Sequence, residues 1–246
     1  MEINFSDPKY YTNRELSWVL FDHRVLNEAR DKNIPLFERL KFLSITASNL
    51  DEFFMIRVAS LKDMENAGYT KKDIAGMTPT EQLKALHVAI HELVDLQYST
   101  YNRSLLPLLE KNGLHIIREH EQLTAEEAAY VDQYFQENVY PVLTPMAVDS
   151  SRPFPLIRNK SLNIGAMVRK KNSDEELEFA TVQVPSVLSR VVRIPSKGKS
   201  CKIILLEEII ERNMDKLFLN YDIVCAHPFR IMRNADLSID EDEAAD

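Results

Sequence analysis

Apolar side chains recur three or four positions apart through the first 110 residues, with polar side chains between them. This spacing predicts four helices joined by short links, and therefore a helical bundle. Asn13 is expected to cap the first helix, and Gly113 to end the last one. The helices are expected over residues 14–30, from Pro35 to about residue 47, over 50–65 and over 79–111.

The other helices also have recognisable starts. Thr78 and Glu81 form a capping box, and Pro35 stands where a first helical turn tolerates proline. The third helix is expected to be capped by Asn49 or Asp51. On the first helix, the stripe expected to face the core is Leu16, Val19, Leu20, His23, Leu26 and Ala29.

After Gly113 the pattern changes from helical spacing to short apolar and alternating runs, which predict strands. A second capping box, Thr124 with Glu127, opens a helix to about Asn138, and another helix is expected over 207–218. Prolines between residues 141 and 155 predict a rigid loop. The strands are expected over residues 114–117, 162–169, 177–184, 190–194, 202–205 and 221–232.

These elements predict an α+β fold, with an amino-terminal helical bundle over residues 1–110 and an α+β domain over residues 111–246. With 45% hydrophobic residues the chain can bury a core, so overall disorder is excluded. The two cysteines, Cys201 and Cys225, cannot build a disulfide scaffold. We expect both to be core thiols in a reducing compartment.

The start of the chain shows no signal-peptide pattern, and no stretch approaches the roughly 20 apolar residues of a membrane helix. We therefore expect a soluble, cytoplasmic protein. Its formal net charge of −8 is unevenly spread: residues 1–151 carry −8, residues 152–235 carry +6 and residues 236–246 carry −6. The basic middle could attract a polyanion, or its cations could keep hairpin tips solvated and blunt strand edges.

The sequence contains no phosphate-binding loop, dinucleotide-fold glycine motif or protease signature. His87 and His91 stand four positions apart, a spacing that could share a metal ion, but no third ligand is apparent. Partly exposed helical histidines are the ordinary interpretation. We therefore assign no metal ligand and no catalytic residue.

The densest segment, residues 48–57, reads Ser-Asn-Leu-Asp-Glu-Phe-Phe-Met-Ile-Arg. Its Asn49 has two interpretations. The side chain could cap a helix, or its carboxamide, which both donates and accepts hydrogen bonds, could contact the edge of a ligand. The residue types alone do not choose between these roles.

Several motifs, in order, resemble those of polyphosphate kinases, the ATP-polyphosphate phosphotransferases of bacteria. Those of the first half resemble the family's amino-terminal domain, and those of the second half resemble its head domain. The matching segments are residues 13–18, 35–43, 48–57, 141–145, 153–155, 159–163, 228–230 and 233–237.

The resemblance implies a reversible reaction in which the ATP γ-phosphoryl group passes to a histidine and then to polyphosphate, with magnesium. It implies a homo-oligomer formed through the head domain, no nucleic-acid partner, and a cytoplasmic location with membrane association left open. It also implies that Asn49, the asparagine of the Ser-Asn-Leu-Asp-Glu motif, lies near the ATP base.

The chain departs from the family by stopping at Asp246, inside an acidic run that leads onwards in the family. The phosphoryl-accepting histidine, the magnesium ligands and the polyphosphate tunnel belong to the family's carboxy-terminal domains. We therefore expect a fragment that folds, binds ATP weakly at best and does not catalyse. The alternative is a non-catalytic module for dimerisation or regulation.

Overall fold

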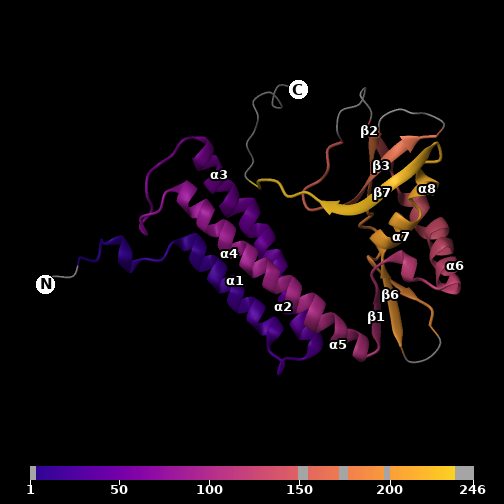
Figure 1. Ribbon diagram of the computed structural model, residues 1–246, viewed down its shortest axis with the longest axis horizontal. Helices are drawn as coiled ribbons and strands as arrows, with labels where there is room; N and C mark the ends of the chain where they lie inside the picture. Colours follow the sequence, from indigo (N-terminus) through magenta and orange to yellow (C-terminus); the bar gives the residue numbers. More distant parts are fainter. Residues whose placement is uncertain (1–3, 149–154, 172–176, 197–199, 236–246) are drawn as a thin grey trace. The chain divides into compact units, whose positions relative to one another are not determined.

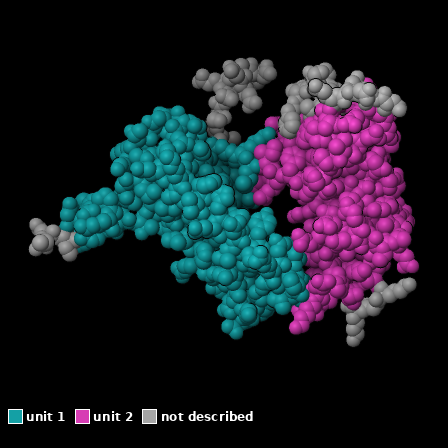
Figure 2. Space-filling model, in the orientation of Figure 1, with its two compact units in different colours: residues 1–109, 232–246 teal, residues 110–231 magenta. Residues whose placement is uncertain are grey.

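The computed structural model describes residues 4–148, 155–171, 177–196 and 200–235. They form two compact units, which are coloured separately in Figure 2. Unit 1 contains Met1–Leu109 and the stretch from Met232, and unit 2 contains Glu110–Ile231. Helices dominate the first unit and mixed sheets occur in the second, so the predicted α+β class is confirmed (Figure 1). The domain assignment to residues 1–110 and 111–246 stays a prediction.

Unit 1 is built from helical segments, of which α1 and α4 begin where the sequence predicts (Figure 1). The Asn13 side chain accepts from the Leu16 N–H, and the capping box of Thr78 and Glu81 is formed. Gly113, with φ at +83°, follows the last helix, as its sequence position indicates. The segments are η1 (Pro8–Tyr10), α1 (Arg14–Arg30), α2 (Leu36–Glu52), η2 (Phe53–Val58), α3 (Ala59–Asn66), α4 (Pro79–Thr100), η3 (Tyr101–Leu105) and α5 (Leu106–Lys111).

The second and third predicted helices are in fact one continuous helical segment, so the predicted break between them is wrong. Segment α2 passes into the π-helical turn η2 and then into α3, and the backbone stays helical at Glu52 and Phe53. No glycine or proline interrupts residues 36–66. Asn49 and Asp51 therefore lie inside a helix and do not cap one, which corrects that interpretation.

The buried face of α1 follows a strict four-three repeat, the spacing of a coiled-coil seam. The helix α2 repeats this spacing along its own buried face. Leu20, expected on the stripe, is 63% exposed, because the seam is narrower than a full apolar face. The buried residues are Glu15, Val19, Asp22, Leu26 and Ala29 on α1, and Arg39, Leu43, Thr46 and Leu50 on α2.

Unit 2 contains two sheets with strand orders β1-β6-β5 and β2-β4-β3-β7. In the first, β1 runs parallel to β6; in the second, β3 pairs antiparallel with both β4 and β7. Helix α6 begins at the formed capping box of Thr124 and Glu127. The strands are β1 (Leu114–Ile117), β2 (Pro145–Val148), β3 (Leu162–Lys170), β4 (Glu178–Gln183), β5 (Val191–Ile194), β6 (Cys201–Leu205) and β7 (Tyr221–Arg230). The helical segments are η4 (His120–Gln122), α6 (Ala125–Tyr134), η5 (Phe135–Val139), η6 (Tyr140–Val142), α7 (Leu206–Arg212) and α8 (Met214–Leu217).

All six predicted strands are confirmed, but three details of unit 2 differ from the prediction. The proline-rich loop contains an edge strand, β2, which begins at Pro145, where a missing N–H is tolerated. The helix predicted over 207–218 is divided at Asn213. Cys225 is exposed, because strand β7 presents it to solvent, and Cys201 is half-buried, so neither is the core thiol that we expected.

Candidate functional site

Asn49, the residue that the sequence motifs single out, lies in the last turn of α2 and faces α1. It is half-buried, and its Nδ2 donates a 2.9 Å hydrogen bond to Oδ1 of Asp22. The contact joins α1 and α2, which run antiparallel. The buried faces of these two helices form the seam of unit 1. The carboxamide oxygen is the remaining acceptor of the Asn49 side chain.

Asp22 is a carboxylate at a core position of the seam. Its exposed fraction is 0%, and its Oδ2 is buried without a hydrogen-bond partner in the described residues. Burial raises the pKa of the Asp22 carboxyl from 3.8 to about 6, and the hydrogen bond from Asn49 offsets part of that rise. At neutral pH the side chain is therefore a largely ionised carboxylate whose partner is a neutral amide.

An aromatic stack lies one helical turn from this pair on both helices. The rings of Trp18 on α1 and Phe53 on η2 have centroids 4.2 Å apart and planes 14° from parallel. Phe53 is 2% exposed, so this stack is a fixed part of the core. The Trp18–Phe53 stack therefore holds Asp22 and Asn49 at a defined separation.

The π-helical turn η2 makes a further contact beyond the stack. A π turn changes the regular hydrogen bonding of a helix and can leave a carbonyl for another partner. The carbonyl of Met55 accepts a 3.0 Å hydrogen bond from the backbone N–H of Ala235. Asn234 adds a side-chain bond to Asp63 at 3.2 Å. Residues 234 and 235 thus pack on the continuous helical segment that carries Asn49.

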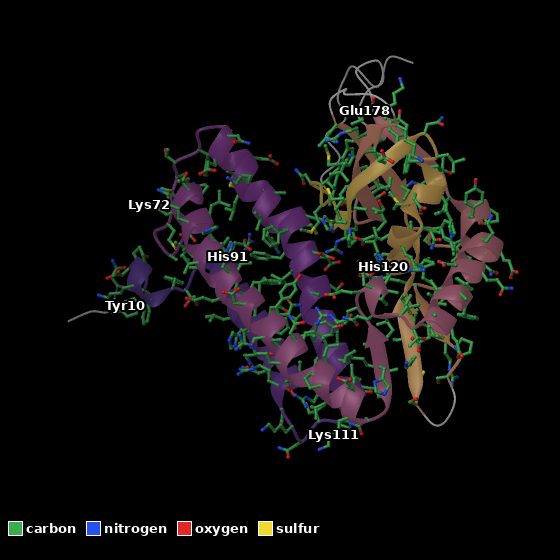
Figure 3. All side chains as sticks on the ribbon, turned by 45° about the vertical axis from the view of Figure 1, so that its right-hand side comes forward. Tyr10, Lys72, His91, Lys111, His120 and Glu178 are labelled. Atoms are coloured by element: carbon green, nitrogen blue, oxygen red, sulfur yellow. The ribbon has the colours of Figure 1, made fainter. Side chains whose placement is uncertain are left out.

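The histidine pair of α4 does not form a metal site among the residues that the structure describes. His87 and His91 have ring centroids 4.2 Å apart, and a ring nitrogen of His91 lies 2.7 Å from the His87 carbonyl oxygen. His91 is labelled in Figure 3. Within the described ranges, no group of three or more His, Cys, Asp or Glu side chains could hold a metal ion. These histidines line a groove of about 430 Å³ whose other lining residues include Phe54, Leu83 and Ile90.

A second cluster of titratable groups lies in unit 2 around His120 (Figure 3). Its ring nitrogens are 3.3 Å from Glu121 and 3.5 Å from Glu208. Burial raises the pKa of the Glu208 carboxyl, and the same cause raises the pKa of Glu211. We assign no chemical role to this cluster.

Strands β3 and β7 bring two of the sequence motifs of unit 2 together. Leu162 pairs with Arg230, and the N–H of Lys160 donates to the Ile231 carbonyl. A groove of about 400 Å³ at this place is lined by Lys160, Arg190 and Phe229, among others. Basic residues of the middle of the chain therefore line a groove of the fold. Lys197, Lys199, Pro153, Phe154 and the acidic stretch 236–246 lie outside the described residues.

Sequence reasoning missed Asp22, the partner of Asn49. The signal was present, because Asp22 lies three residues after Val19 and four before Leu26, on the four-three repeat. A charged residue at such a position is rarely fully buried unless it is paired. The predicted stripe, which included Leu20 and His23, was wider than the buried face and therefore did not single out Asp22.

The sequence matches two family profiles over most of its length. Residues 11–117 match the polyphosphate kinase N-terminal domain, and residues 126–246 match the polyphosphate kinase middle domain. A protein named polyphosphate kinase from Lactiplantibacillus plantarum is 49% identical over 244 residues, and one from Bacillus anthracis is 47% identical over 248 residues. Each alignment covers 99% of this chain, but 34% and 35% of the respective relative.

A solved structure gives the same result. The crystal structure of polyphosphate kinase from Porphyromonas gingivalis matches with a TM-score of 0.81 and 29% sequence identity, over 93% of this chain and 34% of that chain. The chain therefore spans about a third of the length of the relatives that it matches. Among the helices of the described residues, none has the length and apolar composition needed to cross a bilayer.

Proposed function

Since this chain belongs to the polyphosphate kinase family, we propose that it forms part of a phosphotransferase that reversibly transfers the ATP γ-phosphoryl group to polyphosphate through a phosphohistidine. The observation that carries this proposal is the ordered match of both units to domains of that family. The relatives are named polyphosphate kinases, and this name gives the reaction class.

Within this activity, unit 1 contributes a contact to the adenine of ATP through Asn49. Three observations support this role. The side chain is half-buried rather than enclosed, its amide nitrogen is already bonded to Asp22, and its oxygen remains as an acceptor. An oxygen in such a place can accept a hydrogen bond from the exocyclic amine of adenine.

Phosphoryl transfer needs a nucleophile, cationic groups and magnesium placed around the phosphates. Magnesium, when bound to such an enzyme, neutralises the charge that develops on the phosphate oxygens. In the parts of the chain that the structure describes, no cluster fits that ion, so we assign no ligand to it. The contribution proposed for this chain is therefore positioning of the base rather than chemistry at the phosphate.

Unit 2 is proposed to supply contacts of a homo-oligomer. Large apolar side chains on its strands and loops are exposed, and burial against a second copy would remove them from water. They include Val187 (80% exposed), Leu219 (70%) and Val224 (52%). A cytoplasmic location is proposed as well, because both cysteines are free thiols, which a reducing compartment maintains.

The test of the adenine contact is Asn49→Ala in the protein produced from the whole reading frame. The KM for ATP in polyphosphate synthesis should rise by roughly tenfold, because one hydrogen bond to the base is lost. The matched control is Asn27→Ala, an exposed asparagine of α1 that should leave the KM unchanged. An unchanged KM in Asn49→Ala, at equal folded fraction by circular dichroism, would refute the contact.

A second experiment separates the proposed enzyme from a non-catalytic module. The chain Met1–Asp246, incubated with γ-labelled ATP, is expected to acquire no stable label, whereas the product of the whole reading frame should form labelled polyphosphate. Stable label on a histidine of Met1–Asp246 would contradict the division of roles proposed here. Absence of polyphosphate synthesis by the whole product would favour the non-catalytic module.

A further inference from the structure

The pairing of Asp22 with Asn49 is unusual for a buried carboxylate. A carboxylate removed from water normally acquires a cation or several N–H donors. Asp22 has a single amide donor at 2.9 Å, and its second oxygen is buried without a hydrogen-bond partner in the described residues. A leucine of similar shape would fit the seam without this cost, so the carboxylate calls for a functional explanation.

We propose that Asp22 is a positioning residue that fixes the orientation of the Asn49 carboxamide and thereby makes the site select a base with a 6-amino group. This inference rests on the proposed contact between Asn49 and the ATP base. It adds a residue from the neighbouring helix, and it adds a reason for the choice of nucleotide.

The orientation follows from hydrogen-bond chemistry. An ionised carboxylate only accepts, so the end of the Asn49 side chain that faces it must be the NH₂ group. A rotated carboxamide would set its oxygen against the Asp22 oxygen, and two acceptors in contact repel each other. With a pKa of about 6, Asp22 is ionised at pH 8, so the preference operates under ordinary assay conditions.

The surrounding packing holds both partners in place. Asp22 is fully buried and therefore cannot turn towards solvent. The stack of Trp18 on Phe53 fixes the two helices one turn away, and Thr46 on α2 is also fully buried. The carboxamide of Asn49 thus presents its oxygen on the side away from Asp22, as the planar geometry of an amide requires.

A fixed acceptor distinguishes purine bases by the group at carbon 6. Adenine carries an amine there and donates to the oxygen. Hypoxanthine and guanine carry a carbonyl oxygen, which faces the Asn49 oxygen as a second acceptor. A site that leaves such a polar group unpaired discriminates strongly, whereas an amide free to rotate accommodates both bases.

The experiment compares ATP with inosine triphosphate, which differs at carbon 6, in the protein from the whole reading frame. The measured quantity is the ratio of kcat/KM for the two nucleotides at pH 8. We expect the unmodified protein to prefer ATP by about tenfold or more. Asp22→Asn should reduce that preference roughly fivefold, because an asparagine there can accept from, or donate to, Asn49 in either orientation.

The matched control is Asp73→Asn, at another asparagine–aspartate pair of unit 1. There the Asn13 side chain donates to Asp73 over 2.7 Å, so the substitution makes the same chemical change. It should leave the nucleotide preference unchanged. A merely structural effect of losing a carboxylate bonded to an asparagine would alter stability in both variants, but it would not alter the ratio.

The outcomes separate this inference from the contact that it rests on. If Asp22→Asn does not fold, Asp22→Leu, which has a similar shape and no polar atom, takes its place with the same expected loss of preference. Suppose that the folded Asp22 variant keeps the wild-type ratio of kcat/KM for the two nucleotides, while Asn49→Ala raises the KM for ATP. This result overturns the positioning role of Asp22 and leaves the Asn49 contact standing. If Asn49→Ala has no effect on that KM, the contact fails and the positioning role fails with it.

Discussion

Two carboxylates, one in each unit, meet a neighbouring element in opposite ways. In unit 2, Asp132 on α6 receives two hydrogen bonds from the Arg212 guanidinium, at 2.8 and 3.0 Å, and this lowers the pKa of its carboxyl. In unit 1, Asp22 receives one bond from a neutral amide, and burial raises its pKa. The Asp132 carboxylate has a charged donor that offsets the cost of its burial, whereas the Asp22 carboxylate has one neutral donor in the described residues.

This difference separates an ion pair that only stabilises the fold from a buried carboxylate that calls for a functional role. The Asp132–Arg212 pair joins two elements and keeps both charges partly in water, so it needs no role beyond the fold. Asp22 lies deeper, with weaker compensation, at a position where an apolar residue fits the repeat. Perturbed groups of that kind concentrate at functional sites.

The largest effect should come from removing Asn49, the hydrogen-bond partner of Asp22 in the described residues. Asn49→Leu leaves both carboxylate oxygens buried without a donor, which should lower the free energy of unfolding by about 2–3 kcal/mol at pH 7.5. Urea titration followed by circular dichroism measures the change. The double variant Asp22→Leu/Asn49→Leu should recover most of the loss, and a double variant as unstable as the single one would contradict this origin.

A smaller effect, of opposite sign, is expected from Asp22→Asn. The folded-state pKa of about 6 exceeds the ordinary value of 3.8, so the wild-type chain loses stability as the pH rises from about 4 to above 6. The variant has no such group and should be more stable at pH 7.5 by about 1–2 kcal/mol. The two proteins should converge near pH 4; a gap that does not change with pH would show that the Asp22 carboxyl is not the source.

The smallest effect should come from the compensated pair. Arg212→Gln should cost about 1 kcal/mol at pH 7, because both side chains are about a third exposed. The lowered pKa of Asp132 stabilises the fold above its ordinary value of 3.8, and that contribution disappears as the pH falls through the lowered pKa. The variant should therefore approach the wild type in acid, as Asp22→Asn does, but from lower rather than higher stability.

Much of the fold could be predicted because local signals were strong. The capping boxes at Thr78 and Thr124 gave the starts of α4 and α6, and short apolar runs gave the strands. The continuous α2–η2–α3 segment could not be predicted in this way. Its polar residues at Asn49 and Asp51 have the types that favour caps, and tertiary packing overrides that preference.

The candidate site was only half predictable, for a physical reason. Asn49 was indicated by its motif, but its partner lies 27 positions earlier on another helix. Periodicity gives the face on which a residue lies, not the residue that it meets across the seam. Only the narrow repeat containing Asp22 could have suggested that a charge was buried there.

Trp18 is the only tryptophan of the chain, and it lies beside this seam, stacked on Phe53. Indole emission from the protein therefore originates one helical turn from Asp22 and Asn49, with no background from any other tryptophan. The molecule thus carries an intrinsic optical reporter, which can follow events at this one contact while unit 2 contributes no tryptophan signal.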